Sequence, residues 1–233
     1  MRELACSEER FLKDVAEHEM IIVRDDGLYR HIRFKKPGTG CMRFDLITWP
    51  GYLCYTGDMG TYVFSRLADM FEFFRADREH MRLRDGRTLA INPGYWGEKL
   101  QAVERSGDGG SYREFSEEKF KRAVLEHLVG WIRYRRDHTT KEERRELWDA
   151  VMFDVIGADG DSGGYRQQVA AHDFHHRVNN RVEFYFQDFW EINVMDYTHR
   201  FIWCCYALAW GITKYDEAKA SQGQAVLGGE VQE

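Results

Sequence analysis

The chain has 233 residues, of which 43% are hydrophobic and 31% charged, and its net charge at pH 7 is −6. This composition is typical of a globular protein with a packed core. The negative charge lies in residues 151–233, which carry six basic and twelve acidic side chains. The sequence therefore lacks the overall basic field that attracts nucleic acid, and its acidic last third would repel nucleic acid or face a basic protein partner.

The cysteines and the apolar runs indicate the compartment. The five cysteines are an odd number without a CxxC pair, and Cys204 and Cys205 are adjacent, which is a poor arrangement for a disulfide framework. The charged residues 1–14 do not have the pattern of a secretory signal. The longest apolar run, at 201–213, is shorter than the about 18 residues that a membrane span needs. We therefore expect a cytoplasmic protein with no membrane partner.

The N-terminal part predicts one short helix followed by an antiparallel meander. Residues 8–17 place apolar side chains at helical spacing. Asp26-Gly27 between two β-rich runs indicates a hairpin, and further turn residues, among them Pro50-Gly51, separate the runs that follow. The expected strands cover residues 20–26, 28–34, 42–48, 52–55 and 61–64. The residues expected on this sheet are Tyr52, Tyr55, Tyr62 and Phe64, with Trp49 at its edge.

Helical patterns dominate from residue 65 onwards. A helix should begin near Ser65, and a short one is expected at 95–103. Ser116 has the position of an N-cap, and Phe115 and Phe120 are spaced as a hydrophobic staple, so a helix should run from there to about residue 136.

The last third continues with helices and one strand. Thr140 and Glu143 have the spacing of a capping box, which predicts a second long helix. Residues 165–178 have a helical pattern, and residues 182–189 alternate as a strand does. Residues 196–219 predict a final helix whose centre is apolar on every face, and such a helix is buried in its domain or covered by a partner.

Together these elements predict an α+β fold. An N-terminal antiparallel β-meander would pack against a helical C-terminal part, with one further strand near 182–189. No repeat and no linker emerges, so we expect a single domain over residues 1–219. The small and polar residues 220–233 are expected to form a disordered tail.

Three histidines form the candidate metal site. His172, His175 and His176 make an HxxHH pattern on the predicted helix, where His172 and His176 share a face because they are four residues apart. The glutamate of an HExxH motif is missing, so the pattern supports a metal-dependent hydrolase or nuclease only as an alternative. Surface or interface histidines are the simpler interpretation, and no cofactor is expected.

Arginines near the predicted helix junction form the candidate nucleic-acid patch. The patch consists of Arg133, Arg135, Arg136, Arg144 and Arg145, with Trp131 and Tyr134 interleaved. Glutamates at 142, 143 and 146 are interspersed, which is the usual pattern of a solvated helix face with ion pairs between successive turns. A nucleic-acid-binding module is therefore a second alternative.

Several segments resemble a family of uncharacterised accessory proteins in temperate phages and prophages of proteobacteria. The segments are RFDLITWPGYLCYTGDMGTYVFSR at 43–66, DMFEFF at 69–74, NPGYW at 92–96 and YTHRFIWCCYALAW at 197–210. The resemblance brings no activity and no catalytic residue with it. It implies a context, because accessory phage genes of this size often act against host defences by binding a protein target.

The leading hypothesis is a non-catalytic phage protein that inhibits a bacterial host defence complex, for instance as an anti-CRISPR protein. The missing catalytic motifs, the 15% of aromatic residues and the acidic last third support it, since aromatic anchors dominate interface energies and an acidic face can occupy a site built for nucleic acid. The expected partner is a host protein or ribonucleoprotein complex in the host cytoplasm, and self-association stays an open alternative. The residues assigned to partner contact are Trp49, Tyr52, Tyr55, Tyr62, Asp159 and Asp161.

Overall fold

The computed structural model describes residues 6–85, 88–104, 112–158 and 164–229. The contacts of the chain divide it into two compact units: unit 1 comprises residues 1–112 and 197–233, and unit 2 comprises residues 113–196. The sequence led us to expect a single domain over 1–219. The last helix returns to the N-terminal sheet, and the segment between them has a core of its own.

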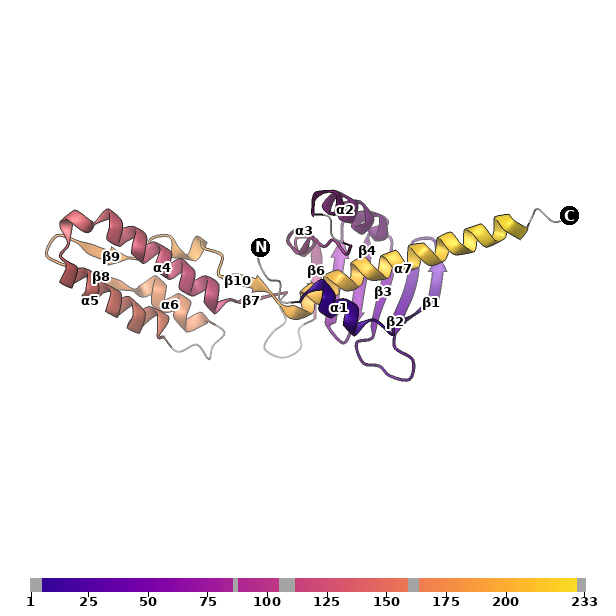
Figure 1. The fold of residues 1–233 in the computed structure, drawn as a ribbon, viewed down its shortest axis with the longest axis horizontal. Coiled ribbons are helices and arrows are strands. Elements are labelled where there is room, and N and C mark those ends of the chain that lie inside the picture. The colour runs from indigo at the N-terminus through magenta and orange to yellow at the C-terminus, as the bar shows by residue number, and fades with distance from the viewer. Residues whose placement is uncertain (1–5, 86–87, 105–111, 159–163, 230–233) are drawn as a thin grey trace. The chain divides into compact units, whose positions relative to one another are not determined.

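Unit 1 is built on a six-stranded antiparallel sheet in which each strand lies beside its neighbour in sequence (Figure 1). Its strands are β1 (Glu19–Asp26), β2 (Tyr29–Lys35), β3 (Phe44–Trp49), β4 (Tyr52–Gly57), β5 (Gly60–Ser65) and β6 (Leu100–Val103). The turns predicted at Asp26-Gly27 and Pro50-Gly51 are present, and Gly27 and Gly51 adopt φ values of 59° and 86°, a region that glycine enters at no steric cost. The predicted α+β fold with an N-terminal meander is confirmed.

The sixth strand was not expected from the sequence. A helix was expected over 95–103, but α3 covers only Pro93–Gly97, and β6 then pairs with β5 through the partners Tyr62 and Val103. A four-residue strand shows too little alternation to be recognised without its partner.

The remaining elements of unit 1 are α1 (Glu8–Asp14), α2 (Met70–Asp85) and α7 (His199–Gly229). In Figure 1, α7 crosses one face of the sheet, and α1, α2 and α3 all contact α7. The helix expected from Ser65 begins five residues later at Met70, because the Asp69 carboxylate accepts a hydrogen bond from Phe71 N at 2.9 Å and so caps its first turn. The residues expected to form a tail from 220 continue α7 as far as Gly229.

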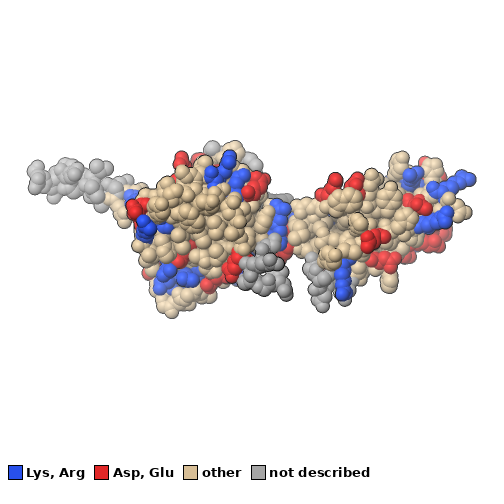
Figure 2. Space-filling model, turned by 180° about the vertical axis from the view of Figure 1, so that it is seen from behind, with Lys and Arg blue, Asp and Glu red and all other residues tan. Residues whose placement is uncertain are grey.

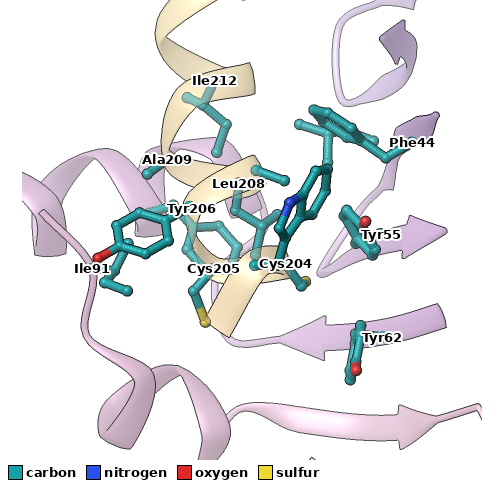
Figure 3. Packing of buried hydrophobic residues seen from close by; sticks show 14 of the residues in the cluster. Phe44, Tyr55, Tyr62, Ile91, Cys204, Cys205, Tyr206, Leu208, Ala209 and Ile212 are labelled. Carbon is teal, nitrogen blue, oxygen red and sulfur yellow. The ribbon is translucent and has the colours of Figure 1, made fainter. Parts of the chain in front are cut away.

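The centre of α7 forms the core of unit 1. Residues 201–209 are all buried, as their apolar character on every face predicted. Trp203 meets Phe11 and Phe44 edge to face, with ring centroids 5.0 and 5.6 Å apart. Figure 3 shows Phe44 and Tyr55 on one side of α7 and Ile91 on the other. A helix enclosed from several directions in this way holds the sheet and the smaller helices together.

Unit 2 is mostly helical. Its elements are β7 (Arg113–Phe115), α4 (Glu117–Tyr134), η2 (Arg136–His138), α5 (Lys141–Val151), η3 (Met152–Ile156), α6 (Tyr165–Asp173), β8 (His175–Arg177), β9 (Glu183–Tyr185), η4 (Phe189–Glu191) and β10 (Met195–Tyr197). Strand β7 pairs with β10, and β8 pairs with β9. The core side chains include Phe120 and Leu128 from α4, Leu147 and Val151 from α5, and Phe184 from β9.

Local capping chemistry in unit 2 matches the sequence. Ser116 Oγ accepts from Lys119 N at 3.4 Å, and the rings of Phe115 and Phe120 lie 5.6 Å apart as a staple. Thr140 and Glu143 form a complete capping box. These predictions are confirmed because each depends only on residues at most five positions apart.

Two other predictions in unit 2 are wrong in extent. The helix expected over 165–178 ends at Asp173, since Phe174 adopts an extended backbone with ψ of 121° and the chain continues as β8. The strand expected over 182–189 is limited to Glu183–Tyr185, the residues that pair with β8. Within the described residues, no helix combines the length and the apolar character needed to span a bilayer.

Candidate functional site: the open face of the sheet

The sheet of unit 1 has two different faces, because successive side chains of a strand point to opposite sides. One face carries Phe34, Phe44, Leu46 and Tyr55, which are all buried beneath α7. We call the other face the open face. Figure 2 views the molecule from the side opposite α7 and shows a broad area of uncharged side chains over unit 1, with charged residues towards its margins.

The centre of the open face is an apolar row that runs across the strands. The register pairs Ile47 with Cys54, Cys54 with Val63, and Val63 with Ala102. Ile47, Cys54 and Val63 are half-buried by their neighbours on the sheet. Because cross-strand neighbours of this kind lie close together, the row is a continuous apolar surface that crosses β3, β4 and β5.

Two stacked aromatic rings lie beside this row, one same-face pair further along β3 and β4. Trp49 closes β3 and pairs with Tyr52 at the start of β4, and their rings lie 5.3 Å apart at an interplanar angle of 15°. Tyr52 is 38% exposed, and Trp49 is half-buried. The Pro50-Gly51 turn sets this pairing, since it leaves two residues between the strands.

A hollow of about 530 Å³ lies beside the stack, over β1, β2 and β3. Val23, Tyr29, His31, Ile47 and Trp49 are among its lining residues. Val23 and Tyr29 are 53% and 46% exposed, so apolar and aromatic surface continues from the row into the hollow. Val23 is available there because the pairing of β1 with β2 shifts register between residues 22 and 24.

A charged network fixes the polar part of the open face. The Asp45 carboxylate is 4% exposed, accepts bonds from Arg33 Nη2 and Nε at 2.8 and 3.0 Å, and lies 2.8 Å from His31 Nε2. Burial opposes ionisation of Asp45, but the hydrogen bonds from Arg33 and His31 outweigh it and lower the pKa of the carboxyl below its usual value. The network therefore holds an arginine and a histidine in set positions beside the apolar row.

Of the six residues assigned to partner contact, the structure brings two together on the open face, namely Trp49 and Tyr52. Tyr55 and Tyr62 lie on the opposite face, where they are 0% and 4% exposed and pack against each other and α7. They therefore belong to the core rather than to a contact surface, and burial raises the pKa of both hydroxyls. Asp159 and Asp161 lie outside the described residues.

The strand period could have separated these tyrosines. Tyr52 and Tyr55 are three residues apart on one strand, and an odd separation places two side chains on opposite faces. Ile47, Cys54 and Val63 were not assigned to partner contact from the sequence, although they share a parity with Trp49 or Tyr52 once the hairpin turns are fixed. The Arg33–Asp45–His31 network needed the pairing of β2 with β3, and no local pattern signals it.

The three histidines of the candidate metal site do not share one helix. His172 lies in the last turn of α6, with Nδ1 2.7 Å from the Asp173 carboxylate, whereas His175 and His176 lie on β8. His175 Nε2 is 3.3 Å from a Glu183 carboxylate oxygen. Among the residues that the structure describes, no group of three His, Cys, Asp or Glu side chains is arranged to hold a metal ion. The prediction placed all three histidines on one helix, and it is wrong because the helix ends at Asp173.

The arginine patch is partly engaged within unit 2. Arg144 Nη1 donates to Arg136 O at 3.3 Å and to Thr139 Oγ1 at 3.1 Å, so it fastens the start of α5 to the preceding turn. Arg145 forms an ion pair with Asp149 at 3.0 Å one turn further along α5. The remaining members of the patch, Arg133, Arg135 and Arg136, lie at the end of α4 and in η2.

No family model, no curated protein and no solved structure matches this chain.

Proposed function

We propose that this chain is a non-enzymatic protein that binds another protein through the open face of its sheet. The observation that carries the proposal is the Trp49–Tyr52 stack, which adjoins the apolar row and the hollow on one face of unit 1. Tryptophan and tyrosine are enriched among the residues that dominate binding energy. Exposed apolar surface that is contiguous and rimmed by polar groups marks protein interaction sites.

The polar groups of the open face favour a protein partner that presents both apolar side chains and hydrogen-bond acceptors. Arg33 remains 34% exposed on its side chain although it pairs with Asp45, so it can offer a donor in a set direction to a carboxylate or a backbone carbonyl of the partner. Because the Arg33–Asp45–His31 network is already formed, binding would not have to order these side chains.

We further propose that the target is a bacterial host protein or ribonucleoprotein complex of a defence system, such as a CRISPR effector, met in the host cytoplasm. This part of the proposal is supported by the resemblance of residues 43–66, 69–74, 92–96 and 197–210 to the phage family. Residues 43–66 include the Trp49–Tyr52 hairpin and much of the apolar row. The segment with the resemblance and the face with the binding chemistry therefore coincide in part.

The test is capture of the partner by the whole chain from lysate of a bacterial host, with and without nuclease treatment. The contact variant carries Trp49→Ala with Tyr52→Ala, and the matched control carries Trp190→Ala, which removes an aromatic ring that is 68% exposed on unit 2. We expect the parent and the control to retain a stoichiometric host protein that belongs to a defence complex, and the contact variant to lose it.

Three results would count against the proposal. Equal capture by the contact variant and the control would place the binding elsewhere, and loss of the captured protein after nuclease treatment would mean that nucleic acid mediates it. Absence of any captured protein would remove the binding role. Melting curves of all variants establish that the contact variant is folded.

A further inference from the structure

A second hollow lies in unit 2, where the end of α4 and the η2 turn meet the turn between β8 and β9. Its volume is about 550 Å³. The lining residues that matter for its chemistry are Arg135, Asp137, His138, Asn179, Asn180 and Arg181. The hollow is thus lined by two arginines, one histidine and two asparagines, with one aspartate among them.

The walls of this hollow are held by hydrogen bonds. Asn179 Nδ2 donates to His138 O and to a Glu143 carboxylate oxygen, both at 3.3 Å, and thereby fastens the β8–β9 turn to η2. The Asn179 side-chain oxygen accepts from Arg181 N at 2.9 Å. The backbone that carries Arg181 is therefore fixed relative to the end of α4, and a ligand would not have to order it.

The two arginines are not neutralised within the described chain. The Arg135 guanidinium lies over the Tyr134 ring, 5.1 Å from its centroid, and its Nε is buried without a hydrogen-bond partner. Arg181 is exposed and forms no ion pair with a carboxylate of the described residues. The nearby Glu143 carboxylate already accepts from Thr140 N at 2.8 Å as well as from Asn179. Neither guanidinium therefore meets a carboxylate within the described residues, and both can offer donors to an anionic ligand.

We propose that this hollow binds a phosphate group through the guanidinium groups of Arg135 and Arg181. A planar guanidinium offers paired donors that match phosphate oxygens, and Asn180 and His138 can add neutral donors. Arg135 belongs to the arginine patch that the sequence predicted. Its partner in phosphate binding is Arg181, from a hairpin distant in the sequence, and not Arg144 or Arg145. The proposal does not depend on the open face, because every residue it uses lies in unit 2.

The experiment titrates the full-length chain with sodium tripolyphosphate at constant ionic strength, with heat of binding as the readout. We expect the parent to bind and Arg135→Gln or Arg181→Gln to weaken the affinity by roughly ten-fold each, as the loss of a charged hydrogen bond does. The matched control is Arg145→Gln, which removes the same charge from unit 2 outside the hollow. It should change the affinity by less than about two-fold, since an exposed charge acts weakly at a distance.

A second titration with a short single-stranded RNA distinguishes the sources of the phosphate. Dependence of RNA binding on Arg135 and Arg181 identifies a nucleic-acid backbone, and binding of tripolyphosphate alone identifies a small phosphate compound. The proposal is overturned if neither probe binds, or if Arg145→Gln weakens binding as much as Arg181→Gln. Arg181 is exposed in a turn, so Arg181→Gln decides the matter even if Arg135→Gln fails to fold.

Discussion

Trp203 Nε1 donates a hydrogen bond to Asp14 Oδ2 across 3.1 Å, and this bond joins α7 to α1. The same indole is fully buried and packs edge to face against Phe11 of α1 and Phe44 of β3. One side chain therefore connects the last helix, the first helix and the sheet of unit 1.

Replacing Trp203 should weaken unit 1 strongly. We expect Trp203→Ala to lower the free energy of unfolding by about 3–5 kcal/mol, because it leaves a cavity among Phe11, Phe44 and α7. Trp203→Phe keeps a ring and loses the bond to Asp14, so its cost should be smaller. Urea denaturation of both variants provides the measurement, and an unchanged midpoint for Trp203→Ala would mean that α7 does not organise the core.

At Gly211, α7 packs tightly against the sheet. A Cβ added there would lie 2.9 Å from Leu46 Cδ1 and 3.1 Å from Phe34 Cε2, so Gly211→Ala should destabilise unit 1 by about 1–3 kcal/mol through overpacking. Gly130 in α4 is the matched control, since a Cβ added there meets nothing within 4 Å. Gly130→Ala should stabilise unit 2 by about 0.5–1 kcal/mol through helix propensity. Hydrogen exchange measures the stability of each unit separately. A change in stability of the same sign for both substitutions would contradict the close packing at Gly211.

Asp45 should make the stability of unit 1 depend on pH at acidic values. Its folded-state pKa is lowered, with burial opposing the shift and the bonds from Arg33 and His31 outweighing burial. The carboxylate therefore contributes stability above its unfolded pKa of about 4, and this contribution is lost as the pH falls through the folded pKa.

Asp45→Asn should consequently reduce the free energy of unfolding at pH 7, and its difference from the parent should shrink as the pH falls below about 4. Urea denaturation across this range provides the measurement. Asp149→Asn is the control, because Asp149 forms an exposed pair with Arg145 and such pairs contribute little. A constant difference between Asp45→Asn and the parent at every pH would show that the carboxylate charge is not the cause.

The cysteines should differ sharply in reactivity. Cys41 is exposed, whereas Cys204 and Cys205 are buried in α7, and burial raises the pKa of both buried thiols. Because the thiolate is the reactive form, a thiol reagent at neutral pH should label Cys41 in the folded protein and reach Cys204 and Cys205 only in denaturant. Peptide mass spectrometry measures each site, and labelling of Cys204 at the rate of Cys41 without denaturant would contradict the burial of α7.

Much of the fold was predictable where residues a few positions apart decide the structure. The meander follows from turn residues such as Gly51, and the start of α4 follows from the Ser116 cap. The segments that the sequence misassigned depend on distant partners. Strand β6 exists because it adds to β5, and β8 replaces the end of a helix because it pairs with β9.

The candidate site was likewise predictable only where residues close in the sequence decide the structure. The proximity of Trp49 and Tyr52 follows from the hairpin that joins β3 and β4. The burial of Tyr55 and Tyr62 requires the knowledge that α7 covers their face, which comes from a segment more than a hundred residues away in the sequence. Arg181 joins Arg135 only through the bonds of Asn179 across unit 2.

The most direct test of protein binding by the open face is site-specific photo-crosslinking in bacterial host cells. A photoreactive phenylalanine analogue replaces Val63 in the apolar row, and in a second protein it replaces Tyr185 of unit 2, which is 53% exposed. After irradiation, we expect a covalent adduct with one host protein from position 63 and none from position 185. Adducts of equal yield from both positions, or an adduct from position 185 alone, would contradict the assignment of binding to the open face.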